Sequence, residues 1–287
     1  MNWLVFTIIA ITARSSYSIA AKVLSNDVRV SPITQSLLLT SSAGMLSLLF
    51  SPFLGGISFN GIGQYGLAAV LMIASQGFAN ILFYKGVQEL DAGTTQIAFS
   101  SILIWGALLS VMFLGSSFSF TQVMGLALMF IAILIVQYKG RKVGISSSVS
   151  YIILSAVLFA IFQVASADLA EELTPATYLA MAYFGPTILI GGLYFRTVKN
   201  DSKKLTQQLM NTATKSLFVS GTSLLYFVCS FLAYSKAPDS GVVVVLLTSQ
   251  VILSVVFGII FLKERDNMNR KLLAGILAVI AGVLIKA

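Results

Sequence analysis

The sequence contains no histidine and a single cysteine, Cys229. Without an imidazole group it cannot form a Ser-His-Asp triad, a Cys-His pair or a histidine-based metal site. One cysteine also cannot form an internal disulfide bond. The sequence therefore predicts no metal site and no cofactor, and the scarcity of catalytic side chains argues against an enzyme.

Charged residues are scarce as well: they make up 10% of the 287 residues, whereas a soluble domain usually has about 25%. Hydrophobic residues account for 57% of the chain, and the mean hydropathy is +0.93. Because this number of charged residues is too small to cover the surface of a soluble two-domain enzyme, we predict an integral membrane protein. The net charge of +8 is compatible with nucleic-acid binding, but the basic residues lie in short breaks between apolar runs. We therefore expect the lipid bilayer, and no nucleic acid, as a partner.

Long stretches without Asp, Glu, Lys or Arg recur along the whole chain. A bilayer core of about 30 Å needs about 20 predominantly apolar residues per helix. Two stretches, 30–84 and 92–138, are long enough for a helical hairpin each, and the first segment, 2–21, fits one helix. Five further segments fit one helix each: 143–167, 173–195, 216–235, 240–262 and 272–285. The sequence thus predicts an all-α fold of ten transmembrane helices.

Polar breaks between these segments indicate how the chain is organised. A basic segment, 139–149, is the natural linker between a first half, 1–138, and a second half, 150–287. The longest polar break, 196–215, has room for a short helix at the membrane surface. A cluster of glycine and proline at 52–56 predicts the turn of the first hairpin.

Positive charges gather in every second loop of this arrangement. All 18 Lys and Arg residues except Arg14, Lys236 and Lys286 fall in loops that follow odd-numbered spans. By the positive-inside rule, these loops face the cytoplasm. We therefore expect a multi-pass protein of the bacterial plasma (inner) membrane with both termini outside.

The two halves share an ordered series of matching residues. Residues 91–93 (Asp-Ala-Gly) and 239–241 (Asp-Ser-Gly) each open a long apolar span, and Pro32 corresponds to Pro175. Because five spans are an odd number, a duplicated five-helix unit must lie inverted relative to the first. Inverted repeats are a recurrent transporter architecture with the substrate site near the middle of the membrane. We therefore expect two inverted five-helix repeats around a central cavity.

Residues 262–265 (Leu-Lys-Glu-Arg) and 273–275 (Leu-Ala-Gly) lie around the start of the last span. They resemble the Leu-Gly-Glu-Arg turn and the glycine-spaced last helix of EamA-type permeases of the drug/metabolite transporter superfamily, and the resemblance covers the whole chain. In the first half, Ser116 stands where the family usually has glutamate. The resemblance implies a cavity lined chiefly by helices 1, 3, 4, 6, 8 and 9, and the export or exchange of small metabolites. Family members are usually drawn with both termini in the cytoplasm, which the positive-charge count contradicts.

Glu264 of this turn is interpreted as structural and is not a candidate site residue. It lies at the membrane surface among basic residues, where solvated ion pairs contribute little.

Arg14 is the most informative single residue, because it interrupts the first apolar segment. An arginine near the bilayer centre costs at least about 2.5 kcal/mol and is found mainly where it faces protein, a cavity or a partner. No acidic residue lies within a predicted span, since Asp91, Asp168 and Asp239 are at span ends. A guanidinium group facing a cavity suits a substrate carboxylate or phosphate, because its planar fork donates two hydrogen bonds. The alternatives are a structural bond to Asp168 or to helix-end carbonyl groups, or a side chain that extends to the membrane surface.

Uncharged polar side chains form stripes on several predicted helices. On the third helix, Gln76, Asn80 and Tyr84 recur every four residues, which places them on one face. Such a stripe either lines a cavity or hydrogen-bonds to a neighbouring helix. Together with Arg14, the candidate substrate-binding residues are Tyr17, Gln76, Asn80, Tyr84, Gln96, Gln163, Tyr226 and Thr248.

Small residues allow close approach of helices at two places, Gly125 with Ala132 and Gly275 with Gly282. We interpret them as a contact between the fifth and tenth spans of one molecule. The expected state is therefore a monomer, with a homodimer as the alternative.

These features favour a secondary transporter of a small zwitterionic or anionic metabolite, such as an amino acid, that works by alternating access. The phosphate-binding motif Gly-x-x-x-x-Gly-Lys-Ser/Thr is absent, so ATP does not drive transport directly. The alternatives are a multidrug or cation efflux permease, a membrane-embedded enzyme acting on lipid-linked substrates, and a channel or structural subunit. The enzyme is disfavoured because the acidic residues near span ends are scattered.

Overall fold

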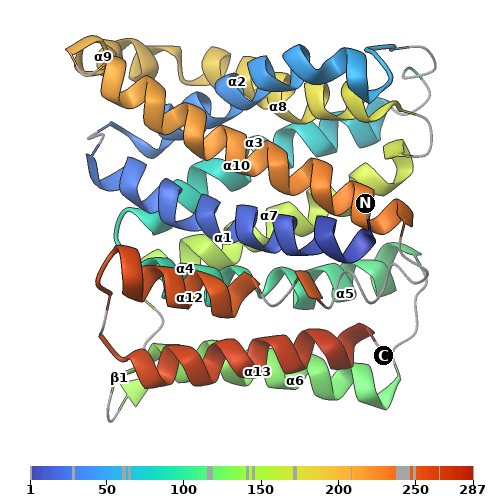
Figure 1. Cartoon of the computed structure of the whole chain (residues 1–287), viewed down its shortest axis with the longest axis vertical. Helices are drawn as coiled ribbons and strands as arrows, with labels where there is room; N and C mark the ends of the chain where they lie inside the picture. Colours follow the sequence, from blue (N-terminus) through green and yellow to red (C-terminus); the bar gives the residue numbers. More distant parts are fainter. Residues whose placement is uncertain are drawn as a thin grey trace.

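The computed structural model shows a helical protein (Figure 1). It describes residues 2–27, 30–59, 63, 66–114, 119–139, 142–143, 146–170, 173–207, 209–236, 246–247, 250–264 and 266–286. Within these residues, every regular element is a helix except a short antiparallel hairpin of two strands. In this hairpin Tyr138 pairs with Val143 and Lys139 with Lys142. The hairpin lies at the predicted linker between the halves.

The helices follow the predicted apolar segments closely. In the first half they are α1 (Trp3–Asp27), α2 (Pro32–Phe50), the 3-10 helix η1 (Ser51–Leu54), α3 (Gly66–Val87), α4 (Ala92–Phe99), α5 (Ile102–Leu114) and α6 (Phe120–Gln137). The hairpin strands are β1 (Tyr138–Lys139) and β2 (Lys142–Val143). In the second half the helices are α7 (Ser147–Ala170), α8 (Pro175–Leu193), α9 (Phe195–Gln207), α10 (Leu209–Lys236), α12 (Gln250–Phe261) and α13 (Met268–Lys286).

The long helices lie side by side, roughly along one common direction (Figure 1). Both chain termini lie at one end of the bundle, whereas α9 and the β1–β2 hairpin lie at the other. We call these the terminal end and the basic end, because α9, the hairpin and the start of α13 carry many of the Lys and Arg residues. The sequence bias in positive charge is thus a bias between the two ends of the folded bundle.

Six described helical segments are long and apolar enough to cross a membrane. They belong to α1, α2 with η1, α3, α7, α8 and α13, and α6 and α12 are shorter apolar helices. The predicted fourth span is not one continuous helix, because a break at Ser100 and Ser101 divides it into α4 and α5. Neither part reaches the length of a span by itself.

Equivalent caps begin α2 and α8. The Ser31 side chain accepts a hydrogen bond from the Thr34 N–H, and the Thr174 side chain accepts one from the Thr177 N–H. A proline follows each cap at the start of the helix, where its missing N–H costs no hydrogen bond. The predicted correspondence of Pro32 with Pro175 is therefore matched in local structure.

The predicted turn at 52–56 is formed by η1 and the two glycines that follow it. Gly55 and Gly56 have φ angles of 89° and 70°, a left-handed conformation that glycine adopts readily. The Thr174 hydroxyl donates a hydrogen bond of 2.7 Å to the Gly56 carbonyl oxygen. This bond holds the turn against the start of α8.

Helices α6 and α13 pack against each other, and Gly125 lies where their backbones come close. A methyl group added at Gly125 would lie 2.8 Å from the Ala281 carbonyl oxygen and 2.8 Å from the Ile285 backbone nitrogen. Neither backbone atom can move aside unless the helices separate. The predicted contact between these two spans is confirmed for Gly125, but Gly275 was assigned wrongly, because a methyl group added there would meet Ile252 and Val251 of α12.

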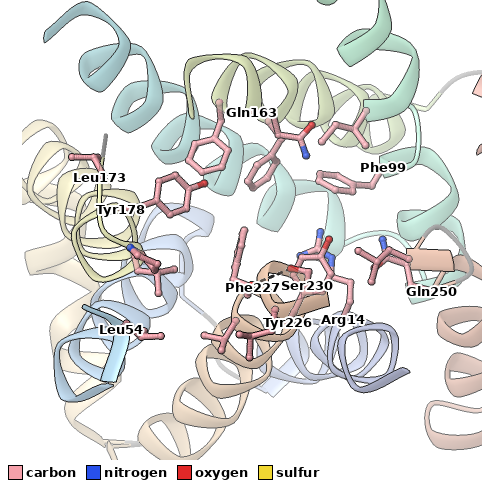
Figure 2. Close-up of a pocket in the computed structure, with 18 of the residues that line it drawn as sticks. Arg14, Leu54, Phe99, Gln163, Leu173, Tyr178, Tyr226, Phe227, Ser230 and Gln250 are labelled. Atoms are coloured by element: carbon pink, nitrogen blue, oxygen red, sulfur yellow. Dashed lines mark hydrogen bonds between the residues drawn. The ribbon is translucent and has the colours of Figure 1, made fainter. Parts of the chain in front are cut away.

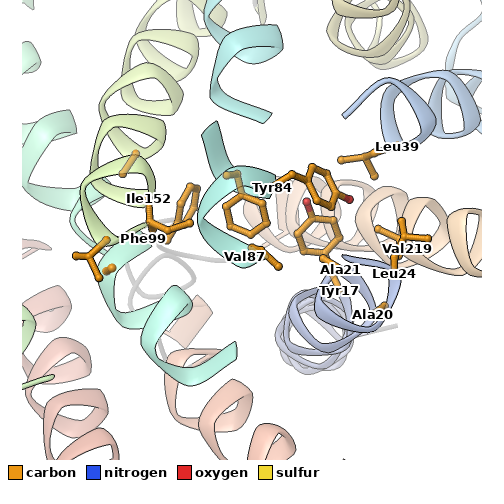
Figure 3. Close-up of a cluster of buried hydrophobic side chains, with 14 of the residues drawn as sticks. Tyr17, Ala20, Ala21, Leu24, Leu39, Tyr84, Val87, Phe99, Ile152 and Val219 are labelled. Atoms are coloured by element: carbon orange, nitrogen blue, oxygen red, sulfur yellow. The ribbon is translucent and has the colours of Figure 1, made fainter. Parts of the chain in front are cut away.

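A cluster of buried aromatic and aliphatic side chains joins α1, α3, α4 and α7 (Figure 3). Tyr17 stacks on Phe83 with ring centroids 6.1 Å apart. Phe83 in turn meets Tyr84 and Phe99 edge to face, at 6.0 Å and 5.6 Å. Aromatic pairs favour these offset and T-shaped arrangements, so the cluster forms a densely packed layer across the bundle.

The polar break expected to have room for a surface helix contains α9. Asp201 of α9 is 8% exposed, and its Oδ2 accepts hydrogen bonds from the Ser31 N–H (3.0 Å), the Ser31 hydroxyl (2.7 Å) and the Thr34 hydroxyl (2.7 Å). Burial opposes ionisation of this carboxyl group, but the hydrogen bonds from Ser31 and Thr34 outweigh it and lower the pKa of Asp201. The carboxylate thus ties α9 to the first turn of α2, where the helix dipole also favours a negative charge.

We expect Asp201→Asn to lower the free energy of unfolding by about 1.5–3 kcal/mol at neutral pH, the range for hydrogen bonds to a charged group. The wild-type contribution is fully present above about pH 4, near the ordinary pKa of aspartate, and is lost as the pH falls through the lower pKa of the folded protein. Thermal unfolding in detergent from about pH 3 to about pH 7 measures this difference. The difference between wild type and variant should shrink as the pH falls below about 4.

Asp266→Asn is the matched control, because Asp266 lies in an exposed turn. It should change stability by less than about 0.5 kcal/mol. A wild-type advantage over Asp201→Asn that stays constant down to the acidic limit would contradict the role given to the Asp201 charge.

Candidate functional site

A cavity of about 1020 Å³ lies between elements of the two halves (Figure 2). Its wall is formed by η1, α1, α4 and α5 from the first half and by α7, α8, α10 and α12 from the second. Phe53 of η1 and Pro175 of α8 belong to this wall, so the cavity extends toward the terminal end. Its volume is at the upper limit of the ~300–1,000 Å³ typical of small-molecule pockets.

Arg14 of α1 lies on the cavity wall and is surrounded by three aromatic rings. Its guanidinium carbon is 4.9 Å from the ring centroid of Tyr17, 5.3 Å from that of Phe99 and 5.4 Å from that of Tyr226. Each distance is within the roughly 6 Å of a cation–π contact. Ring faces attract the cation without accepting conventional hydrogen bonds, so these contacts hold the side chain and leave its N–H groups able to donate.

Within the described residues, the Arg14 guanidinium group has no ion pair and no hydrogen bond. The side chain of Asp168, a structural partner considered from the sequence, lies outside the described residues. The N–H donors of Arg14 are therefore available to a ligand in this part of the cavity.

Uncharged polar side chains lie on the same side of the cavity as Arg14. Ser230 of α10 and Gln250 of α12 are close to it in Figure 2, and Gln163 of α7 extends into the cavity from another side. The Gln250 Oε1 atom is buried and has no hydrogen-bond partner among the described residues. A buried acceptor without a donor costs about 1–3 kcal/mol, so this oxygen is an unsatisfied polar group beside the cavity.

The rest of the cavity wall is apolar and largely aromatic. Phe159 and Phe162 of α7 and Tyr178 of α8 line it, with Leu54 and Leu173 farther from Arg14 (Figure 2). Sequence reasoning did not single out Phe162 or Tyr178, because aromatic residues occur along the whole of this chain. A regular spacing that would mark them as cavity residues is also absent, since they come from different helices.

Four of the candidate residues are brought together by the fold. Arg14, Gln163 and Tyr226 line the cavity, and Tyr17 contacts the Arg14 guanidinium group. They come from α1, α7 and α10, and Phe99 of α4 completes the ring contacts. The helices thus place residues from both halves around one cation.

Four of the other candidate residues lie elsewhere. Gln76, Asn80 and Tyr84 share one face of α3 as predicted, but they are 3%, 2% and 0% exposed and lie outside the cavity wall. Gln96 of α4 is buried outside the wall as well, and Thr248 lies outside the described residues. Among the described residues, the cavity wall contains none of α3, the third predicted span, which the resemblance placed there. It does contain residues of α8, which is the seventh predicted span and is not among those that the resemblance placed there.

Charged side chains join the two halves at the basic end. Both carboxylate oxygens of Glu264 accept the Ala92 N–H at the start of α4, at 3.1 Å and 2.9 Å. The Lys271 ammonium group lies 3.1 Å from the Asp91 carboxylate. Within the first half, Lys22 of α1 donates to the Val87 carbonyl oxygen at the end of α3. Burial raises the pKa of Glu264 despite its hydrogen bond to Ala92. These contacts support the structural interpretation of Glu264, because it caps a helix of the other half.

Comparisons with known proteins agree with this architecture. The sequence matches the EamA-like transporter family over residues 1–138 and 146–286. An uncharacterized transporter of Archaeoglobus fulgidus is 27% identical over 221 residues, which cover 76% of this chain and 75% of the relative. A protein of known crystal structure matches with a TM-score of 0.63 over 98% of this chain and 97% of its own, and at 12% identity this likeness shows the fold alone. Since the family match covers nearly the whole of a chain rich in membrane-length apolar helices, the protein belongs to the EamA-like transporter family.

Proposed function

We propose that the protein is a secondary transporter that carries a small zwitterionic or anionic metabolite, such as an amino acid, through the cavity by alternating access. One observation carries the choice of substrate: Arg14 lies on the cavity wall without an ion pair or hydrogen bond within the described residues. A cation inside a membrane protein is costly unless a partner compensates it. A substrate carboxylate is that partner, because it accepts two parallel hydrogen bonds from a guanidinium group.

The Gln250 amide supports a zwitterion in preference to a simple anion. Gln250 belongs to the wall of the same cavity as Arg14, and its buried side-chain oxygen has no hydrogen-bond partner among the described residues. An amino acid carries a carboxylate for Arg14 and an ammonium donor for Gln250. The apolar remainder of the cavity accommodates a side chain.

Ten crossings in two inverted halves, 1–138 and 150–287, with 139–149 as linker, are part of the same proposal. The separate family matches to 1–138 and 146–286 support two related halves. The equivalent proline-containing caps of α2 and α8 support them as well. In this arrangement α4 and α5 together form one broken crossing, and broken helices at substrate sites are a recurrent feature of transporters.

The contacts between the halves at the basic end also fit alternating access. The cavity extends to the terminal end, while the Glu264–Ala92 and Lys271–Asp91 contacts join the halves at the basic end. Transport requires these contacts to separate when the cavity opens to the other side. With the basic end in the cytoplasm of a bacterial plasma membrane, the cavity extends toward the outside.

The described cavity wall contains no Asp or Glu. Proton-coupled transporters commonly use an intramembrane carboxylate as the proton carrier. Facilitated diffusion or exchange of substrates is therefore favoured over proton coupling at this site.

The aromatic walls favour a second candidate function, the efflux of apolar or cationic drugs. Phe159, Phe162, Tyr178 and Phe227 provide ring faces that attract such compounds. The positive charge of Arg14 disfavours cations in the same cavity, so the first proposal is preferred.

A ligand panel tests the proposal directly. We expect amino acids or small organic acids to raise the unfolding temperature of the purified protein, whereas quaternary ammonium compounds and apolar drugs do not. A ligand that binds only the folded protein adds about 2.7 kcal/mol of stability at 100 times its dissociation constant. Stabilisation by cations or apolar drugs alone would instead establish the drug-efflux alternative.

A further inference from the structure

The helix α9 presents a row of basic residues at the basic end of the bundle (Figure 1). Arg196, Lys199 and Lys203 follow one another at intervals of three and four residues, so they lie on one face of the helix. Lys204 borders this face, and all four residues are exposed. We call the surface that these four residues form the α9 basic face.

Asp201 lies on the opposite face of α9, which packs against the bundle. At 3.6 residues per turn it is roughly 160° around the helix axis from both Lys199 and Lys203. Its carboxylate accepts hydrogen bonds from the hydroxyl groups of Ser31 and Thr34 at the start of α2. Because this contact fixes the rotation of α9, the basic face points away from the helices that α9 packs against.

The charges of the α9 basic face have little compensation within the protein. Among the described residues, the side chains of Arg196, Lys199 and Lys203 have no ion pair and no hydrogen bond. Lys204 is attracted by Asp201, the one acidic residue of α9, but that carboxylate already accepts hydrogen bonds from α2. The basic face is therefore available to an anionic partner.

Exposed apolar residues flank α9 along the chain and place it at the membrane surface. Leu193 at the end of α8 and Phe195 at the start of α9 are 61% and 64% exposed. Leu217 and Phe218, at the start of the next predicted span, are 50% and 60% exposed. Since α8 is long and apolar enough to cross a membrane, apolar side chains exposed at its end face acyl chains. The α9 basic face therefore lies at the level of the lipid headgroups.

We propose that the α9 basic face binds the headgroups of anionic phospholipids and anchors the basic end of the bundle to a negatively charged membrane surface. Each basic residue near such a surface strengthens the attraction by about fivefold. A water-soluble acidic protein would neutralise the same charges. The exposed ring of Phe195, one helical turn before Lys199, favours lipid instead, because an aromatic ring beside a basic residue suits the boundary between acyl chains and headgroups.

The test uses the full-length protein in nanodiscs, with a fluorophore attached to α9. Cys229→Ser removes the single native cysteine, and Asn200→Cys places one at an exposed position next to Lys199. Nitroxide-labelled phosphatidylglycerol and phosphatidylcholine with identical acyl chains serve as quenchers. We expect phosphatidylglycerol to be enriched at α9 by at least about fivefold over phosphatidylcholine, the effect of about one basic residue near the surface. In about 1 M salt, where the Debye length is about 3 Å, this preference should be lost.

Two pairs of substitutions distinguish charge from general structure. Lys199→Gln with Lys203→Gln should reduce the enrichment by at least about fivefold. Lys199→Arg with Lys203→Arg should keep it, because arginine retains the charge. A fluorophore at Thr121→Cys is the matched control, because Thr121 is exposed at the start of α6 and no Lys or Arg occurs between residues 86 and 138. There the two lipids should quench equally.

Equal quenching by the two lipids at α9 overturns the proposal, and so does an enrichment that Lys199→Gln with Lys203→Gln leaves unchanged. The same enrichment at Thr121→Cys as at α9 also overturns it, because the lipid preference would then not depend on α9. If Cys229→Ser fails to fold, the unlabelled protein decides. Phosphatidylglycerol should then raise the unfolding temperature of the wild type relative to phosphatidylcholine, and the two glutamine substitutions should remove the difference. Equal unfolding temperatures of the wild type in the two lipids contradict the proposed anchor.

Discussion

Arg14→Gln is expected to weaken binding of the stabilising carboxylate substrate by about 10- to 150-fold, which corresponds to about 1.5–3 kcal/mol for hydrogen bonds to a charged group. Glutamine is polar but offers neither the charge nor the planar fork of the guanidinium group. Transport of the radiolabelled substrate into proteoliposomes should fall accordingly. Thermal unfolding with and without substrate measures the loss of binding independently of transport.

Two further variants distinguish charge from shape and from general destabilisation. Arg14→Lys keeps the charge but loses the bidentate geometry, so we expect binding between that of wild type and Arg14→Gln. Arg196→Gln removes a positive charge from the exposed surface of α9 and should bind substrate as the wild type does. If Arg14→Gln binds and transports normally, Arg14 is structural and the proposed substrate class is wrong.

Gly125→Ala is expected to destabilise the protein by about 1–3 kcal/mol, the usual cost of overpacking a close contact. Its new methyl group would lie 2.8 Å from backbone atoms of Ala281 and Ile285 in α13. Since backbone atoms cannot rotate away as side chains do, α6 and α13 must move apart. Thermal unfolding in detergent measures the change, and Gly125→Val should lower the unfolding temperature further.

Gly221→Ala provides the matched control for this substitution. Gly221 lies in α10, and a methyl group added there meets no atom within 4 Å. Alanine should leave the stability unchanged or raise it by about 0.5–1 kcal/mol, because glycine is the poorer helix former. Equal stability changes at Gly125 and Gly221 would show that the α6–α13 contact does not depend on glycine.

The polar stripe on α3 shows what helical periodicity predicts and what it does not. Spacing alone placed Gln76, Asn80 and Tyr84 on one face, and this shared face follows from helix geometry. Whether that face meets a cavity or other helices depends on the helices packed around α3. In the structure all three side chains are buried and lie outside the cavity wall. The spacing of the stripe does not indicate this outcome.

For Arg14, unlike the α3 stripe, the sequence did indicate the kind of surroundings. Its position within an apolar segment pointed to a partner or a cavity, because an isolated charge is costly in lipid. The sequence also marked Tyr17 and Tyr226 as candidates, but Phe99 joined them only through the fold. Gln250 is not among the candidate residues from the sequence, and its unpartnered amide oxygen is a property of the packed helices.

The sequence by itself determined four features of this protein. They are its class as a membrane protein, its helical segments, the helix α9 in the polar break, and the positive charges in alternate loops. Each depends on hydropathy, charge or spacing within a short stretch of chain. The tertiary structure decided which faces meet: the three rings around Arg14, the Glu264 cap on α4, the Asp201 contact of α9 with α2 and the break between α4 and α5. The reason is that contacts between residues far apart in the chain depend on the positions and rotations of whole helices, and no short stretch of sequence contains that information.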